Sequence, residues 1–116
     1  MKFIQVISGD VKEGKFAELQ RWLVENEPGF AETTPEGSEY LGAFFSVYSS
    51  EREMGRLFCL HALDSYGAQD RLAQPGTAYA ALLDELTDFF DQRNQARAGA
   101  LLLKRVTAAT LLGSEN

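Results

Sequence analysis

The sequence predicts a single α+β domain in which strand, helix, strand, strand, helix and strand follow one another. Three observations lead to this prediction. Apolar residues alternate with polar ones over short segments, they recur at helical spacing over two longer segments, and residues 55–63 are apolar on both faces, which is typical of a central strand. Two right-handed βαβ units joined by a hairpin give a four-stranded antiparallel sheet with both helices on one face.

Length, composition and charge exclude several classes of protein. The 116 residues fit one domain, residues 1–116, and 45% of them are hydrophobic, which is enough for a core. The net charge of −6, without a basic run, predicts no nucleic-acid or membrane partner, because phosphates and anionic membranes attract clustered Lys and Arg. The single cysteine allows no internal disulfide, and no apolar run suits a signal peptide or a membrane span, so we expect a cytoplasmic protein.

The first half of the chain predicts a strand, a helix and a second strand. Residues 3–8 alternate as a strand, and residues 13–26 carry apolar side chains at helical spacing. Asp10 and Glu13 are compatible with a capping box before this helix, and the Pro-Gly step at residues 28–29 is expected to end it. After a polar loop, the second strand is expected over residues 40–49.

The second half supplies the remaining elements. The polar segment before Gly55 is the expected turn of a hairpin into the third strand, residues 55–63, and a short helix follows it to Leu72. A longer helix is expected to run to about Arg93. Residues 99–106 form the expected last strand, and the two leucines at 111–112 in the tail are expected to pack on the body of the protein.

The distribution of apolar residues also predicts assembly. Two helices cover one face of the sheet, yet the second and third strands are apolar on both faces. A monomer would therefore expose a large apolar patch. We expect a homodimer in which a second copy of the sheet covers the face opposite the helices.

Two short segments carry a resemblance to a known superfamily. The step Leu63-Asp-Ser-Tyr66 out of the third strand and the segment Leu72-Ala-Gln-Pro-Gly-Thr-Ala-Tyr79 that opens the long helix, in this order of elements, resemble the ferredoxin-like dimeric α+β barrel proteins. These include antibiotic-biosynthesis monooxygenase-like proteins, stress-responsive barrel proteins and small polyketide cyclases. The resemblance implies a homodimer whose sheets close a barrel, with a ligand cavity between each sheet and its own or the partner's helices. It does not imply one activity.

His61 is the first candidate for a catalytic residue. Alternation in the third strand places it on one face with Cys59, and we expect this face to point into the barrel, because the other face is uniformly apolar and suits the helices. Histidine transfers protons near neutral pH, which suits enolisation, aldol cyclisation or hydroxylation of a phenol. The alternative is a histidine that is hydrogen-bonded for packing. A position facing the helices, or one without a cavity beside it, would argue against the catalytic reading.

The expected substrate-binding residues surround this histidine. Aromatic side chains with a few hydrogen-bonding groups are the usual lining of a small-molecule pocket, although the same side chains could form the dimer core. Cyclase-like members use histidine and tyrosine in the cavity, a pattern that this chain matches better than the asparagine and tryptophan of the monooxygenases. The expected substrate-binding residues are Gln5, Trp22, Tyr40, Phe44, Ser46, Tyr48, Cys59 and Tyr66.

The sequence predicts no metal site and no nucleotide cofactor. One histidine without matching cysteine or carboxylate spacing does not build a zinc or iron site within one subunit, and no GxGxxG or Walker sequence occurs. Haem needs one axial histidine and is not excluded by the residues. Cys59 lies roughly 6.5 to 7 Å along the strand from His61, which favours a buried hydrophobic residue over a nucleophile paired with the histidine.

Three functions therefore remain open. The first is a cofactor-free enzyme, a cyclase or monooxygenase, that acts on a hydrophobic oxygenated substrate (polyketide-like or phenolic) with His61 as acid or base. The second is a non-catalytic protein that binds such a molecule, and the third is a structural dimer module with a filled barrel. A cavity beside His61 would favour the first two.

Overall fold

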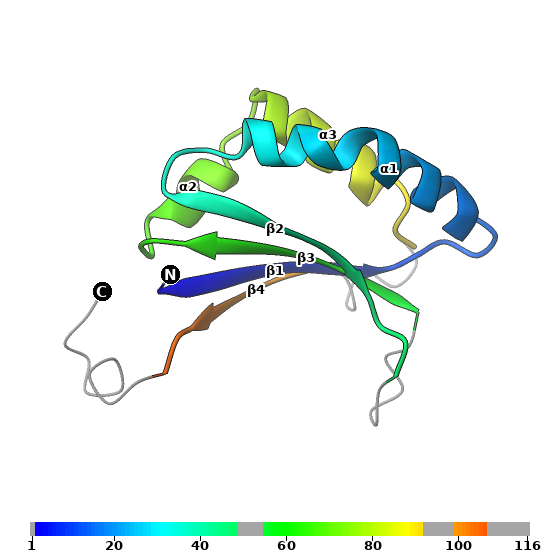
Figure 1. Ribbon diagram of the computed structural model, residues 1–116, viewed down its shortest axis with the longest axis horizontal. Coiled ribbons are helices and arrows are strands. Elements are labelled where there is room, and N and C mark those ends of the chain that lie inside the picture. The colour runs from blue at the N-terminus through cyan, green and yellow to red at the C-terminus, as the bar shows by residue number, and fades with distance from the viewer. Residues whose placement is uncertain (1, 49–54, 92–98, 107–116) are drawn as a thin grey trace.

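The computed structural model describes residues 2–48, 55–91 and 99–106 and arranges them in two layers (Figure 1). A four-stranded antiparallel sheet of order β2-β3-β1-β4 forms one layer, and the helices lie on one of its faces. The predicted α+β, ferredoxin-like order of elements is confirmed. The strands are β1 (Phe3–Asp10), β2 (Ser38–Phe45), β3 (Arg56–Leu63) and β4 (Gly99–Lys104), and the helices are α1 (Phe16–Thr33), α2 (Ala68–Leu72) and α3 (Ala78–Thr87).

The core fills the space between the helices and one face of the sheet. Leu57, Cys59 and Leu63 of β3 are buried there, and Leu19 of α1 and Leu86 of α3 cover them. Each of these side chains is at most 3% exposed, so they are shielded from bulk solvent. Every second residue of the two central strands therefore points toward the helices, and the residues between them point to the opposite face of the sheet.

Helix α1 is longer than expected, because Pro28 and Gly29 do not end it. Proline removes one backbone hydrogen bond of the helix, and tertiary packing outweighs that loss here. Phe30 is only 1% exposed and contacts the rings of Trp22, Tyr40 and Tyr79. The expected capping box is also absent, since β1 continues to Asp10 and Lys15 stands at the helix start without a side-chain cap.

Helix α3 ends at Thr87, earlier than the expected end near Arg93. The chain after it joins the segment that follows β1: Lys12 N–H donates to the Phe89 carbonyl at 2.8 Å, and Asp91 N–H donates to the Asp10 carbonyl at 2.7 Å. These bonds replace the next turn of helix. The expected hairpin turn over 49–54 and the tail leucines at 111–112 lie outside the described residues.

Strand β2 contains a bulge that changes which side chains share a face. Its register to β3 shifts between Tyr40 and Gly42, and Gly42 has φ +135°, a value that favours glycine. Tyr40 therefore faces the helices, whereas Phe44 lies on the opposite face and is 53% exposed. The expected wall that joined Tyr40 and Phe44 on one face is wrong for this reason.

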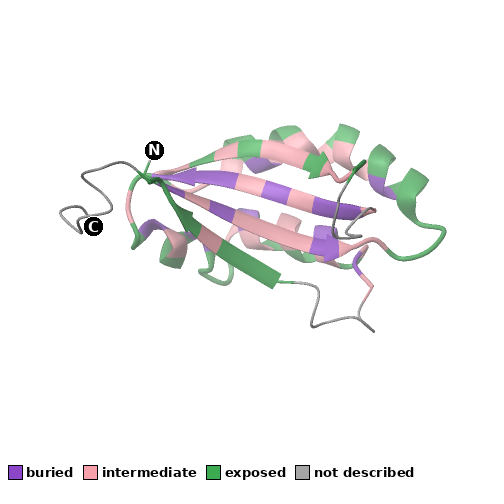
Figure 2. Ribbon diagram, turned by 90° about the horizontal axis from the view of Figure 1, so that it is seen from below, coloured by how far each residue is buried: buried purple, intermediate pink, exposed green. Residues whose placement is uncertain are grey.

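The face of the sheet opposite the helices is not covered by any of the described elements (Figure 2), and it carries apolar side chains. The register places Val6 of β1, Leu60 of β3 and Leu101 of β4 side by side there, and Leu101 is 57% exposed. Arg56 lies at one end of this face, where its guanidinium donates to Asp10 Oδ1 at 3.2 Å and Ser8 Oγ at 3.1 Å. In the described parts of the chain, no helix has the length and apolar character to cross a membrane.

Candidate functional site

His61 lies on the helix-facing side of β3, which corrects the expected orientation. It is 0% exposed, and its neighbours on this face, Cys59 and Leu63, belong to the core under the helices. The expectation failed because both faces of β3 are apolar, so alternation alone did not indicate which face the helices cover. Phe58 and Leu60 take the open face instead.

The partner of His61 is Tyr79 of α3. The Tyr79 hydroxyl lies 2.8 Å from His61 Nε2, and the two rings meet edge to face with centroids 5.4 Å apart. Burial lowers the pKa of His61 to about 4 and raises the pKa of Tyr79 well above its ordinary value. At neutral pH both side chains are therefore uncharged, and a neutral histidine is hydrogen-bonded to an intact phenol.

This histidine is expected to make the protein less stable in acid. The unfolded chain takes up the imidazole proton near pH 6.5 and the folded chain only near pH 4, so the stabilisation is complete above 6.5 and falls as the pH drops toward 4. The loss relative to neutral pH reaches about 2 kcal/mol at pH 4.5. Urea unfolding at pH 7 and 4.5 measures it, with His61→Gln as the reference that keeps every other titrating group. Equal pH dependence in both proteins would contradict the assignment, and NMR titration of the sole imidazole gives its pKa directly.

Tyr40 approaches His61 from the neighbouring strand. The two residues are paired in the β2–β3 register, and their rings lie edge to face at 5.4 Å. The Tyr40 hydroxyl donates to Glu27 Oε2 of α1 at 2.7 Å, and the same oxygen accepts from Ala43 N–H at 3.1 Å. Burial, together with this bond to a carboxylate, raises the pKa of Tyr40 far above its usual value. Glu27 thereby ties α1 to the strand just beyond the bulge.

Gln5 completes a polar row across three strands. It is 9% exposed and stands opposite His61 in the β1–β3 register, on the same face. Among residues 2–48, 55–91 and 99–106, Gln5 Oε1 and His61 Nδ1 are both buried without a hydrogen-bond partner. Ser38 Oγ is a third such atom, next to Leu63. Because buried polar atoms are normally paired, two neighbouring unpaired atoms mark this part of the core as unusual.

Cys59 lies in the same layer but does not have the character of a nucleophile. It is 1% exposed, and burial, with a smaller effect of the Glu27 charge, raises its pKa to about 12. The side chain is therefore a thiol at neutral pH, and thiols are poor nucleophiles.

The structure separates the other predicted site residues from His61. Phe44 lies on the open face, and Tyr48, beyond the end of β2, is 81% exposed. Ser46 Oγ accepts from the Arg56 backbone N–H at 3.0 Å, outside the buried row. Tyr66 is 60% exposed and touches the edge of Phe3. These four residues do not meet the histidine.

Trp22 belongs to the packing of the helix layer. Its ring lies 5.9 Å from Phe30 and 6.1 Å from Phe89, measured between centroids. These contacts connect it to the aromatic group around Tyr40 and Tyr79 through Phe30, without a direct contact to His61 among the ring pairs of the described residues.

Three residues of this cluster were missed as site residues: Glu27, Phe30 and Tyr79. Tyr79 lies in the segment that opens the long helix, and Phe30 follows the Pro-Gly step that was expected to end the first helix. The spacing of Leu19, Leu23 and Phe30, four and seven residues apart, was the signal that α1 continues past Pro28. No local pattern indicates the long-range contacts of Glu27 and Tyr79, because strands and helices distant in the chain make them.

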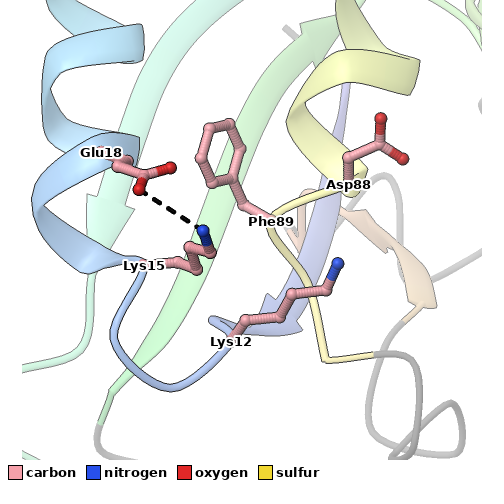
Figure 3. A pocket seen from close by; sticks show the side chains of 5 residues that line it. All are labelled: Lys12, Lys15, Glu18, Asp88 and Phe89. Atoms are coloured by element: carbon pink, nitrogen blue, oxygen red, sulfur yellow. Dashed lines mark hydrogen bonds and ion pairs between the residues drawn. The ribbon is translucent and has the colours of Figure 1, made fainter.

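The pockets formed by described residues lie elsewhere on the surface. One, of about 200 Å³, opens between the start of α1 and the end of α3, where the Phe89 ring stands among Lys12, Lys15, Glu18 and Asp88 (Figure 3). Lys15 donates to Glu18 there at 3.4 Å, so the pocket carries charges of both signs. The part of the chain that the structure describes contains no group of three or more His, Cys, Asp or Glu that could hold a metal ion.

Solved structures share this fold at low sequence identity. A NIPSNAP family protein from Agrobacterium tumefaciens superposes with a TM-score of 0.64 at 14% identity, covering 92% of this chain and 90% of its own. An uncharacterized NIPSNAP domain protein from Burkholderia xenovorans gives 0.61 at 12%, covering 91% and 96%. A "putative antibiotic biosynthesis monooxygenase" from Bordetella bronchiseptica gives 0.63 at 13%, covering 92% and 100%.

These similarities identify the architecture. The chain shares the ferredoxin-like α+β fold, with its four-stranded antiparallel sheet, with these solved structures. At such low sequence identities, the similarity shows a shared fold and does not indicate a shared activity. Any activity must be argued from the residues of the site. No protein-family model matches the sequence, and no curated protein matches it.

Proposed function

We propose that the protein is a homodimeric barrel enzyme that acts on a small hydrophobic molecule bearing oxygen, polyketide-like or phenolic, without a metal or nucleotide cofactor. The substrate binds between the sheet and the helices of each subunit, and His61 acts there as acid or base. The reaction class is cyclisation or monooxygenation. The observation that carries this proposal is the buried, uncharged His61, hydrogen-bonded on one ring nitrogen and unpaired on the other.

The proposed dimer follows from the open face of the sheet. Phe44, Leu101 and Leu103 are 53%, 57% and 45% exposed on a face whose central positions are also apolar. Water contact with a continuous apolar sheet face costs free energy, and a second copy offers a face of matching shape and chemistry. The fold supports this arrangement, since dimers are typical of the superfamily.

The helix-facing position of His61 is one that was expected to argue against catalysis. The proposal rests instead on the polar and aromatic groups around the side chain. His61 no longer shares a face with the expected aromatic wall of Phe44 and Tyr48. It lies instead in the layer between sheet and helices, where the superfamily resemblance places the ligand cavity, among the rings of Tyr40 and Tyr79.

Tyr79 supports proton transfer at His61 in either direction. Its hydroxyl can donate to Nε2 or accept from it, so the ring can hold its proton on either nitrogen while Nδ1 faces a substrate oxygen. An aldol cyclisation needs such a transfer and ends with loss of water. Oxidation of a phenol to a quinone also balances without a cofactor, because O₂ gives one atom to the ring and the other to water.

Turnover by the wild type and variants tests the proposal. A panel of phenols and polyketide-like diketones is screened for oxygen uptake and for loss of water by mass. We expect His61→Ala to lower turnover by about 10²-fold or more, the usual effect of losing an acid–base group. Tyr79→Phe keeps the ring and removes the hydroxyl. We expect turnover to fall about tenfold, because the hydrogen bond that orients the His61 imidazole is lost.

Tyr66→Phe is the matched control, because it removes a hydroxyl from a ring that is 60% exposed and remote from His61. Circular dichroism verifies that each variant is folded. Full activity of folded His61→Ala would refute the catalytic role. Binding without turnover in the wild type would assign the chain to non-catalytic ligand binding.

One observation favours a second candidate, a structural dimer module with a filled interior. His61 is 0% exposed, and three surface pockets lined by described residues do not include it. In this case His61→Ala lowers the melting temperature, and no compound of the panel binds. Thermal denaturation with and without the panel therefore separates the two candidates.

A further inference from the structure

Gln5 and His61, directly opposite each other on the central strands, each bury a polar atom in the core. Within the described residues, neither Gln5 Oε1 nor His61 Nδ1 has a hydrogen-bond partner. Opposed residues in an antiparallel pair have Cα atoms roughly 4.5 to 5.5 Å apart, and both side chains stand on the helix-facing side. A small group that lies between these two side chains would contact both atoms.

The tautomer of His61 decides what that group must accept. If Tyr79 O–H donates to Nε2, the proton of the imidazole lies on Nδ1 and only that N–H lacks a partner. If Nε2–H donates to Tyr79 instead, the phenolic proton and the Nδ1 lone pair are both left without a partner in the described structure. Each buried unpaired group costs free energy, so we assign the first tautomer to the resting protein, before any proton transfer takes place.

The position then requires a group that accepts from Nδ1–H and donates to Oε1. A hydroxyl does both through a single oxygen atom, whereas a carbonyl or an ether satisfies only the histidine. A carboxylate would face the Gln5 oxygen, and an ammonium would face the histidine N–H. Either charge would also lose its hydration in this core.

We propose that Gln5 and His61 bind the hydroxyl group of a phenol or alcohol, and that a water molecule holds the same position when no such ligand is present. This inference rests on the proposed function and names its substrate class. The rings of Tyr40 and Tyr79 flank the histidine and favour a flat aromatic hydroxyl compound. Gln5 is a positioning residue that orients the substrate oxygen against Nδ1.

Phenol and toluene are the matched probes, since they have similar shapes and only phenol carries the hydroxyl. By calorimetry on the wild type, we expect phenol to bind at least tenfold more tightly than toluene, because toluene leaves both buried atoms unpaired. Gln5→Met removes the acceptor and keeps much of the volume. It is expected to weaken phenol at least tenfold and to leave toluene affinity within about twofold.

Gln20→Met is the control, because Gln20 is exposed on α1, and it is expected to change neither affinity. NMR provides the second readout, since the chain has one histidine and the Nδ1–H signal is unambiguous. Without ligand, this proton is expected to show cross-relaxation with a bound water, and phenol is expected to remove that signal. If Gln5→Met fails to fold, the wild-type NMR arm still tests the inference.

Several outcomes would overturn the inference. Equal affinity of the wild type for phenol and toluene excludes hydroxyl recognition. If phenol does not displace the water signal, the position holds a structural water. If the Nδ1–H proton shows no water signal and no response to phenol, nothing binds at this position. If the protein turns over other substrates but binds phenol and toluene with equal affinity, this inference is refuted and the proposed function stands. If the protein prefers phenol to toluene but turns over no compound, the proposed function is refuted and this inference stands.

Discussion

Replacing Phe44 and Leu101 with glutamate is expected to convert the proposed dimer into monomers at micromolar concentration. The two side chains stand on opposite edge strands of the open sheet face and are 53% and 57% exposed in the single chain. Association would bury four unpaired carboxylates in each dimer, and each buried charge costs several kcal/mol. The dissociation constant is therefore expected to rise by about 10³-fold or more.

Light scattering and analytical ultracentrifugation over a concentration series measure this change. Val24→Glu is the control: Val24 is 81% exposed on the outer side of α1, away from the sheet, and its replacement should leave the dimer unchanged. The glutamates lie on an exposed face of the single chain, so the monomer should keep its circular dichroism spectrum. A dimer that survives both substitutions, or a wild type that is already monomeric, would refute assembly through this face.

Adding one methyl group at Gly9 is expected to be among the most destabilising single changes in the chain. A Cβ at this position would lie 2.4 Å from Cδ2 and 2.6 Å from Cγ of Phe90, far inside van der Waals contact. Phe90 is 4% exposed and its backbone pairs with Val11, so moving its ring away from the new methyl group would disturb the buried core. We expect Gly9→Ala to cost about 3 kcal/mol, near the upper end for overpacking, or roughly a 10 °C fall in melting temperature.

Gly67→Ala is the matched control, because a Cβ there meets no atom within 4 Å and its φ of −66° suits alanine. It is expected to be neutral or slightly stabilising. If the clash is the cause, Phe90→Leu should partly rescue Gly9→Ala, so that the double variant loses less stability than the sum of the single ones. A melting temperature of Gly9→Ala equal to the wild type would show that the ring moves aside freely.

The order of elements and the antiparallel sheet were predictable because they depend on local signals. Alternation, helical spacing and turn residues each act over a few positions, and they agreed with one another. The end of α1 was not predicted, because the packing of Phe30 against three rings outweighs the local effect of Pro28. Similarly, α3 stops early because residues near Phe89 bond to the segment after β1.

The candidate site was only partly predictable. The sequence singled out His61 and also named Gln5 and Tyr40, which the strand registers place opposite it, whereas Glu27, Phe30 and Tyr79 were missed. The side of the sheet to which His61 points could not be predicted. Leu57 and Phe58 are equally apolar, so the alternation along β3 does not indicate which of its faces the helices cover. The bond to Tyr79 joins residues 18 apart through the packing of α3 on β3, and no spacing rule specifies it.

The bulge in β2 also bears on how chain length can vary among relatives of this protein. Leu41 is the residue that the register passes over, so its deletion would leave Tyr40 under the helices and Phe44 on the open face. A deletion inside β3 would instead exchange the faces of every residue on one side of it, and could move His61 out of the core. Insertions and deletions are therefore tolerable at the bulge and damaging in the central strands, and gaps in alignments of this fold are expected to concentrate near Leu41.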